Sequence, residues 1–146
     1  MSAQPPITAS TIISFCTDLE ARSEAFYAAM SARFPEKSEA FHRMARDCVK
    51  SSTQVTRTYQ ETVTDALETG FSFASISLAD YEVDAELPAE ADLPQAVGQA
   101  LALEETAIVF YEAVAESSES LLATIPRAFR RVAKTRRRRR EKLETL

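Results

Sequence analysis

The sequence predicts an all-α protein built as a four-helix bundle, and three observations support this fold class. Only 2 of the 146 residues are glycine, whereas β folds rich in turns need glycine in number. In four long segments the apolar residues recur at spacings of three and four, which is the period of an amphipathic helix. A polar stretch over residues 71–91 separates the first two segments from the last two, so we expect two hairpins joined by a long crossover.

Residues 8–146 are expected to form one domain, since 146 residues with 45% hydrophobic and 27% charged side chains suit a single soluble core. Residues 1–7 are expected to be disordered, because Pro5 and Pro6 bar an early helix. No apolar run is long enough to span a membrane, and the N-terminus lacks the basic and apolar regions of a signal peptide. We therefore expect a cytoplasmic protein that does not bind a membrane.

The first two helices are predicted to form an antiparallel hairpin. Thr8 or Ser10 is suited to cap the first helix, whose apolar stripe continues to Phe34. Pro35 interrupts this helix, and a second one starts at about residue 36 and continues until near Gly70. The turn between them is short, and a short turn forces the two helices to lie antiparallel.

The second hairpin follows the connection over residues 71–91. Asp92 is predicted to cap the third helix, with Gln95 at the capping-box position. A turn over residues 117–124 leads to a fourth helix that opens around Pro126 and reaches Leu143. The connection is long enough to run the whole length of the bundle. The second and third helices can therefore lie parallel, as in bundles with one long crossover.

Charge is distributed unevenly along the chain. Residues 1–126 carry 7 basic and 20 acidic side chains, whereas residues 127–146 carry 10 basic and 2 acidic ones. The basic part contains five consecutive arginines, Arg136 to Arg140. Successive residues on an α-helix are about 100° apart, so this run covers the whole circumference and at least one arginine must face the core. The plainer interpretation is a solvated basic helix end.

Glu20 and Glu104 lie within the apolar stripes of the first and third predicted helices. A buried carboxylate without a partner is unfavourable, so each of them needs a cation, a metal ion or a proton. Either residue could instead lie at the edge of its stripe and reach water. Two thiols, Cys16 and Cys48, are predicted to face the same interior. We interpret them as structural thiols, with a redox pair as the alternative.

The chain repeats itself, which makes the two glutamates equivalent. DLEARSEAFY at residues 18–27 aligns with ALEETAIVFY at residues 102–111, and both segments have Leu-Glu and Phe-Tyr at the same positions. AFHRMARDCVKS from Ala40 aligns with AFRRVAKTRRRR from Ala128. The two hairpins are therefore interpreted as versions of one unit.

On these motifs the sequence resembles the rubrerythrin branch of the ferritin-like superfamily, over about residues 11–143. The resemblance implies a ferritin-like four-helix bundle with a di-iron site. In that family the first and third helices carry an inward Glu ahead of a Phe-Tyr pair, and the second and fourth carry Glu-x-x-His. In this chain only two of the six expected ligands remain, which implies a degenerate di-iron site. The six vestigial positions are Glu20, Cys48, Ser51, Glu104, Arg136 and Arg139.

We expect Arg136, helped by Arg139, to form ion pairs with Glu20 and Glu104 in the place where this family holds its two irons. The fork of a guanidinium satisfies two carboxylate oxygens at once, so arginine would replace the metal charge. No metal, no other cofactor and no catalytic residue is then expected. His42 is expected to face solvent and not to bind a metal. The remaining arginines, expected in solvent or against acids of the connection or of a partner chain, are Arg130, Arg131, Arg137, Arg138 and Arg140.

Three function classes follow. The first is a non-catalytic, metal-free protein that acts by assembly, either as a homo-oligomer of at least two copies or with another protein. Exposed aromatic side chains of Phe71, Phe73 and Tyr81 would help to form that contact. The second is a di-iron oxidoreductase acting on peroxide or oxygen, with iron held by substitute ligands. The third is a binder of acidic partners through the basic fourth helix, although the pI near 5.0 and the lack of aromatics between the arginines argue against nucleic acid.

Overall fold

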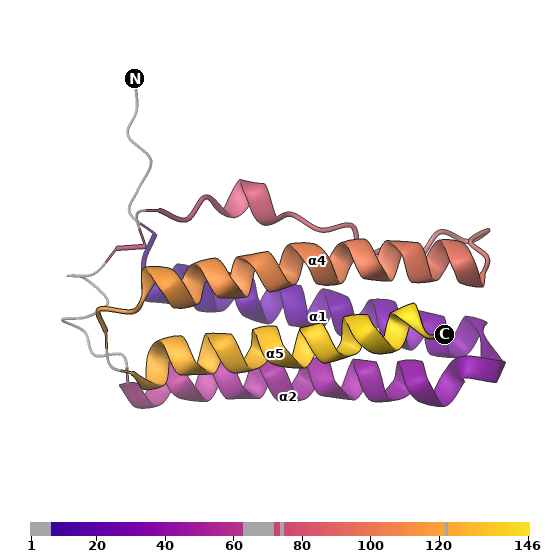
Figure 1. Ribbon diagram of the computed structural model, residues 1–146, viewed down its shortest axis with the longest axis horizontal. Helices are drawn as coiled ribbons and strands as arrows, with labels where there is room; N and C mark the ends of the chain where they lie inside the picture. Colours follow the sequence, from indigo (N-terminus) through magenta and orange to yellow (C-terminus); the bar gives the residue numbers. More distant parts are fainter. Residues whose placement is uncertain (1–6, 63–71, 74, 122) are drawn as a thin grey trace, which may run out of the picture.

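The computed structural model describes residues 7–62, 72, 73, 75–121 and 123–146, and this part of the chain contains four long helices (Figure 1). They are α1 (Ala9–Arg33), α2 (Ser38–Thr62), α4 (Leu93–Ser117) and α5 (Thr124–Glu144). Two short 3-10 helices, η1 (Pro35–Lys37) and η2 (Leu78–Tyr81), lie in the connections. The described residues contain no strand, so the predicted all-α class is confirmed.

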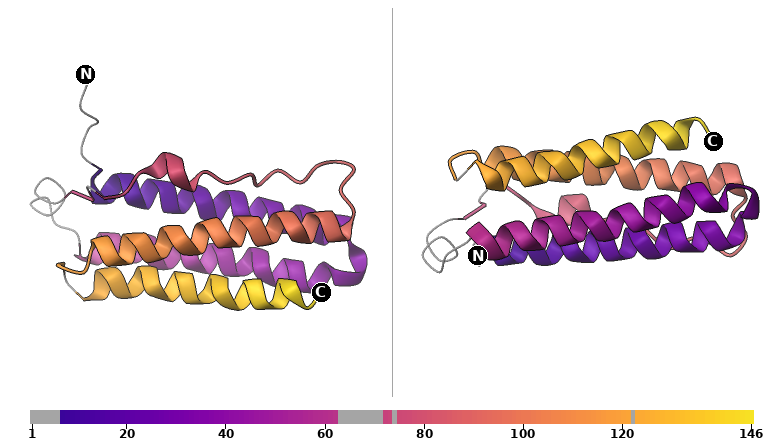
Figure 2. Two further views of the ribbon diagram at one scale, coloured as in Figure 1. Left: turned by 45° about the horizontal axis from the view of Figure 1, so that its top comes forward. Right: turned by 90° about the horizontal axis from the view of Figure 1, so that it is seen from below.

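The four long helices lie side by side as two antiparallel hairpins. α1 packs against α2, α4 packs against α5, and α2 also contacts α5. The described part of the connection, residues 75–92, runs along the length of the bundle, and α2 and α4 run in the same direction (Figures 1 and 2). The order of hairpin, long crossover and hairpin is the one expected from the sequence.

Local signals in the sequence set the helix ends. The Thr8 hydroxyl accepts a hydrogen bond from the Thr11 backbone N–H and caps α1, which ends at Arg33, two residues before Pro35. α4 begins with the predicted capping box, in which the Asp92 side chain and the Gln95 side chain each accept from the backbone N–H of the other residue. The predicted end of the second helix near Gly70 lies outside the described residues.

The crossover lies as an extended cover over α1 and α4. Its side chains alternate between half-buried and exposed from residue 81 to 88, as in a strand without a sheet. On the α1 side, Arg22 donates a hydrogen bond to the Val83 carbonyl at 2.7 Å. On the α4 side, the Gln99 amide donates to the carbonyls of Asp84 and Glu86. These bonds attach the crossover to one helix of each hairpin.

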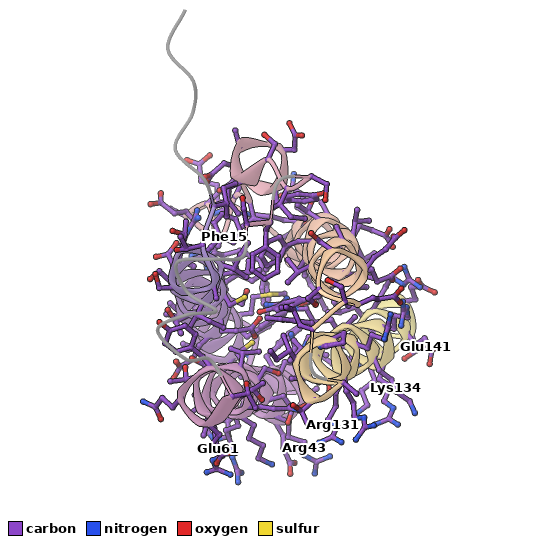
Figure 3. The ribbon with its side chains drawn as sticks, turned by 90° about the vertical axis from the view of Figure 1, so that its left-hand side faces the viewer. Phe15, Arg43, Glu61, Arg131, Lys134 and Glu141 are labelled. Atoms are coloured by element: carbon purple, nitrogen blue, oxygen red, sulfur yellow. The ribbon has the colours of Figure 1, made fainter. Side chains whose placement is uncertain are left out.

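The expectation that aromatic side chains of the crossover are exposed is wrong for the two that the structure describes. Phe73 is 1% exposed and belongs to the core. Tyr81 is half-buried and packs against Phe110 with 5.4 Å between ring centroids. Phe15 of α1, which is labelled in Figure 3, contacts the same Phe110 ring. These ring contacts pack the crossover against α1 and α4. Phe71 lies outside the described residues.

The start of the described chain is also part of the fold. Ile7 packs against the core, and its carbonyl accepts a hydrogen bond of 2.9 Å from the Phe73 backbone N–H. The expected disorder over residues 1–7 is therefore wrong at residue 7, while residues 1–6 lie outside the described part. Among the helices of the described residues, none has both the length and the apolar character needed to cross a lipid bilayer.

Candidate functional site

Four charged side chains meet in the interior of the bundle. Glu20 comes from α1, Glu104 from α4, and Arg136 and Arg139 from α5. All four are buried, and Arg136 is the largest fully buried side chain among the described residues. Two carboxylates and two guanidiniums give a formal charge of zero, which is the balance that a low-dielectric interior requires.

Arg136 joins the carboxylates of the two hairpins. Its Nη2 and Nε atoms donate to Glu20 Oε2 at 2.7 Å and 3.2 Å, and its Nη1 donates to Glu104 Oε1 at 2.8 Å. Nη2 also donates to the hydroxyl of Ser23 at 3.0 Å. The ion pairs predicted for Arg136 are thus present, and every nitrogen of this guanidinium has a partner.

Arg139 is held less completely. Its Nη1 donates to Glu104 Oε2 at 3.2 Å, which is the predicted ion pair. The guanidinium carbon also lies 5.5 Å from the ring centre of Tyr27, within the range of a cation–π contact. Its Nε and Nη2 reach no hydrogen-bond acceptor in the described part of the chain. Arg139 therefore supports the cluster through one nitrogen and one ring.

Two tyrosines complete the cluster, and sequence reasoning missed both. The Tyr27 hydroxyl of α1 donates to Glu104 of α4, and the Tyr111 hydroxyl of α4 donates to Glu20 of α1 at 2.6 Å. Each tyrosine follows a glutamate by seven residues, which places both side chains on one helix face. Because α1 and α4 run antiparallel, each tyrosine reaches the glutamate of the other hairpin.

At neutral pH each charged group of the cluster stabilises the ionised form of its neighbours. Burial alone would raise the pKa of Glu104, but the charges of Arg136 and Arg139 and the Tyr27 hydrogen bond hold this pKa below its usual value. Burial would lower the pKa of Arg136, but Glu104 and Glu20 raise it well above its usual range. Burial and the neighbouring carboxylates raise the pKa of both tyrosines, which therefore remain protonated hydrogen-bond donors.

The two cysteines lie beside the cluster as free, buried thiols. Burial, followed by the charge of Glu20, raises the pKa of Cys16 far above its usual value. Burial also raises the pKa of Cys48, to about 12. Both are therefore protonated at neutral pH, whereas metal binding and disulfide exchange require the thiolate.

The residues at the six positions that the family resemblance assigns to di-iron ligands do not fit a di-iron centre. Such a centre needs carboxylates to offset the metal charge and imidazoles to complete the coordination. The two carboxylates here already accept hydrogen bonds from guanidinium and hydroxyl groups, and two guanidiniums would repel a cation. His42 is exposed on α2, as expected. Within the described ranges, no group of three or more His, Cys, Asp and Glu side chains is placed to hold a metal ion.

The other arginines of the basic helix are distributed around it. Three of them form a row of ion pairs with glutamates. Their side chains reach solvent, which is one of the two expectations, and their acidic partners are not residues of the connection over 71–91. The acids belong to α4 and to the turn that follows it. The pairs are Arg130–Glu119, Arg137–Glu112 and Arg140–Glu105.

Arg131 and Arg138 instead line surface grooves that residues of α2 also line. Both are exposed, and Arg138 lines a groove between α2 and α5. The five consecutive arginines therefore point in three directions: two into the core, two towards α4 and one towards α2. This distribution follows from the helical period.

Comparisons of the chain with protein-family models, with curated proteins and with solved structures gave no match. What the cluster is able to do chemically follows from its own residues. The thiols are protonated, the carboxylates are held by arginine and tyrosine, and Arg136 has no exposed atom. Such an arrangement is suited to joining helices.

Proposed function

We propose that this chain is a non-catalytic, metal-free ferritin-like protein, related to the rubrerythrin branch, in which an Arg–Glu network stands in place of a di-iron centre. The two antiparallel hairpins, the long crossover and the parallel course of α2 and α4 support a ferritin-like arrangement. The observation that carries the proposal is the position of Arg136, which lies between the two glutamates that the internal repeat makes equivalent.

A guanidinium is chemically suited to this replacement. In a di-iron protein the metal ions neutralise the inward carboxylates and tie the helices together. Arg136 does both for Glu20 and Glu104, because it is positively charged and donates along separate directions to each. Arg139 supplies the second positive charge. With the same bundle and no metal, the chain would keep the architecture and lose the redox chemistry.

Metal content tests this proposal. The full chain is produced in medium supplemented with iron, and iron, manganese and zinc are measured per chain by mass spectrometry. We expect metal far below one equivalent, whereas two irons per chain, the content of a di-iron centre, would contradict the proposal. A matched control restores the missing ligand types and is expected to gain metal. Its substitutions are Cys48→Glu, Ser51→His, Arg136→Glu and Arg139→His.

We further propose that the protein acts through assembly, because basic side chains of α2 and α5 and acidic side chains of the crossover lie on opposite sides of the bundle. Arg43 of α2 and Arg131 and Lys134 of α5 point away from the bundle on the side opposite the crossover (Figure 3). The crossover carries the opposite charge, with acidic residues Asp80, Glu82, Asp84, Glu86 and Glu90. A basic face on one copy and an acidic face on another form a head-to-tail contact, which produces rings or filaments.

Salt dependence tests the assembly. Sedimentation velocity of the chain at about 50 mM and about 500 mM NaCl compares weak with strong screening of surface charge. We expect oligomers at low salt that dissociate at high salt, and we expect Arg131→Glu with Lys134→Glu to abolish them. Arg46 is exposed at another position of α2. Arg46→Glu serves as a control, because it changes the charge by as much as either one of these two substitutions. A monomer under both conditions would contradict self-assembly.

A further inference from the structure

Arg139 retains one complete edge of its guanidinium without a hydrogen-bond partner among the described residues. Its Nη1 donates to Glu104, while Nε and Nη2, which form the opposite edge, reach no acceptor. In Arg136 the corresponding Nε–Nη2 edge donates two hydrogen bonds to Glu20. Buried polar atoms without a partner are unfavourable, so this edge of Arg139, together with Glu20 Oε1, is hydrogen-bonding capacity that the described residues leave unused.

Arg139 also forms part of the wall of a groove between α2 and α5. The groove has a volume of about 470 Å³, which is within the range of small-molecule sites. Ser51 of α2, another of the vestigial positions, lines the same groove and is 4% exposed. Two positions that the family resemblance assigns to metal ligands therefore lie where the interior meets this groove.

The charge around the groove is strongly positive. Its lining includes a single acidic side chain, Asp47, among the described residues. Arg43 is paired with Glu39 at 3.0 Å, whereas the other three exposed cations of the groove have no ion pair with a described residue. The five cationic side chains of the lining are Arg43, Lys50, Arg138, Arg139 and Lys142.

We propose that this groove binds a phosphate-bearing small molecule, with two phosphate oxygens on the Nε–Nη2 edge of Arg139. The paired N–H groups of a guanidinium edge match two oxygens of a phosphate. Lys50, Arg138 and Lys142 offset the remaining negative charge, and this surplus of cations favours a multiply charged phosphate over a single carboxylate. The lining residues that the structure describes include no aromatic ring, so they offer no surface for stacking a nucleic-acid base.

Access to the edge sets a condition on the ligand. The Nε and Nη2 atoms are out of contact with bulk solvent, so a phosphate on this edge must enter from the groove between α2 and α5 that Arg139 lines. A compact terminal phosphate meets this condition better than a phosphate within a polymer backbone. This inference does not depend on the proposal that the chain binds no metal. The Nε–Nη2 edge of Arg139 has no partner even though Nη1 of the same guanidinium is paired with Glu104.

Calorimetric titration of the full chain with sodium diphosphate, at about 50 mM NaCl to limit screening, tests the proposal. We expect one binding site per chain and a melting temperature that rises with diphosphate concentration, since binding to the folded state stabilises it. Arg138→Gln with Lys142→Ala is expected to weaken binding by about tenfold or more. Arg137→Gln removes a charge from the same helix at a position paired with Glu112, and its affinity is expected to stay within about twofold of the original.

The role of the guanidinium edge needs its own test. Arg139→Lys keeps the positive charge and removes the paired donors, so binding is expected to weaken by about tenfold. Equal affinity of Arg139→Lys and the unaltered chain would overturn the proposal. A second measurement avoids any change in folding: in ¹H–¹⁵N spectra of the unaltered chain, the Nε–H resonance of Arg139 should shift on adding diphosphate. An unmoved resonance at saturation, or no binding at all, would also overturn it.

Discussion

At the scale of single residues, Arg136 shows how a charged side chain becomes part of an apolar core. Its exposed fraction is 0%, yet every nitrogen of the guanidinium has an acceptor. The transfer of a guanidinium from water into the core costs free energy. The ion pairs offset this cost only when both charged partners are present. The destabilising step is therefore the removal of one partner from the cluster.

Arg136→Gln tests this argument. The substitution leaves Glu20 without a cationic partner and Glu104 with Arg139 alone, and breaking a buried pair costs about 3–5 kcal/mol. We expect the free energy of unfolding in urea to fall by that amount. The matched control, Arg137→Gln, removes an exposed partner of Glu112 and should change the stability by about 1 kcal/mol or less. Equal effects of the two substitutions would refute a structural role for the buried pair.

The protonation of Glu104 makes stability depend on pH. Its pKa in the folded chain is lowered, so between the folded and unfolded values the unfolded chain binds more protons and stability rises with pH. The contribution is complete above the usual Glu value of about 4.3 and is lost as pH falls through the lower folded pKa. We expect the stability difference between the unaltered chain and Glu104→Gln to be largest at pH 7 and to shrink towards pH 3.

Urea unfolding at several pH values measures that difference. Glu105→Gln is the matched control, because Glu105 is the next residue on α4 and forms an exposed pair with Arg140. Its stability difference should vary little over the same range. If the difference for Glu104→Gln were constant from pH 7 to pH 3, the arginines would not be holding Glu104 ionised.

At the scale of secondary-structure elements, single-helix patterns predicted most of the architecture. The capping box at Asp92, the helix end before Pro35 and the inward direction of Arg136 all follow from residues within one helix turn or one helical period. The Arg–Glu pairing was also predicted, because two buried acids require cations and a run of five arginines on a packed helix must turn at least one of them into the core.

Features that depend on the register between elements were not predictable in the same way. The bonds of Tyr27 to Glu104 and of Tyr111 to Glu20 exist only because α1 and α4 pack antiparallel at one register. The ion pairs of Arg137 and its neighbours with α4 likewise depend on how α4 and α5 align. The crossover aromatics were misassigned because a buried extended segment has neither the helical period nor the partners of a sheet strand.

Gly98 lies within α4 and is unfavourable for helix stability, so the effect of replacing it can be predicted. Gly98 is exposed in the interior of α4, and a Cβ atom added there would have no atom within 4 Å. Glycine in a helix interior is less favourable than alanine because the unfolded chain loses more conformational freedom. Gly98→Ala is therefore expected to raise the free energy of unfolding by about 0.5–1 kcal/mol in urea denaturation.

A decrease in stability would show that Gly98 contacts something other than solvent. One such contact is a neighbouring copy of the chain in an assembly. To separate the two cases, the measurement is repeated over a range of protein concentrations, since assembly makes apparent stability depend on concentration. We expect the gain from Gly98→Ala to be the same at every concentration.

At the scale of the whole molecule, the buried cluster connects the two hairpins. Glu20, Ser23 and Tyr27 come from the first hairpin, whereas the two arginines, Glu104 and Tyr111 come from the second. The internal repeat makes the α1 and α4 contributions symmetric, because each glutamate accepts from the tyrosine of the other hairpin. The symmetry is broken by α5, which supplies both cations, while α2 supplies no charged member.

A cluster of this kind is expected to be more costly to break than to replace. Buried ion pairs exchanged as a unit for apolar side chains of similar volume often leave stability unchanged or increase it. We therefore predict that a combined variant folds with a free energy of unfolding within about 2 kcal/mol of the original. The substitutions are Glu20→Met, Glu104→Met, Arg136→Met, Arg139→Met, Tyr27→Phe and Tyr111→Phe.

The comparison that decides the point is between this combined variant and its single substitutions. Arg136→Met and Glu104→Met alone each leave a buried charge without its partner, and each should lose about 3–5 kcal/mol in urea unfolding. Because the residues share one network, the losses should not add. If the combined variant lost as much as the sum of the single ones, the cluster would be a net source of stability. Recovery in the combined variant would instead show that the charges must be matched, and that the apolar packing around them holds the two hairpins together.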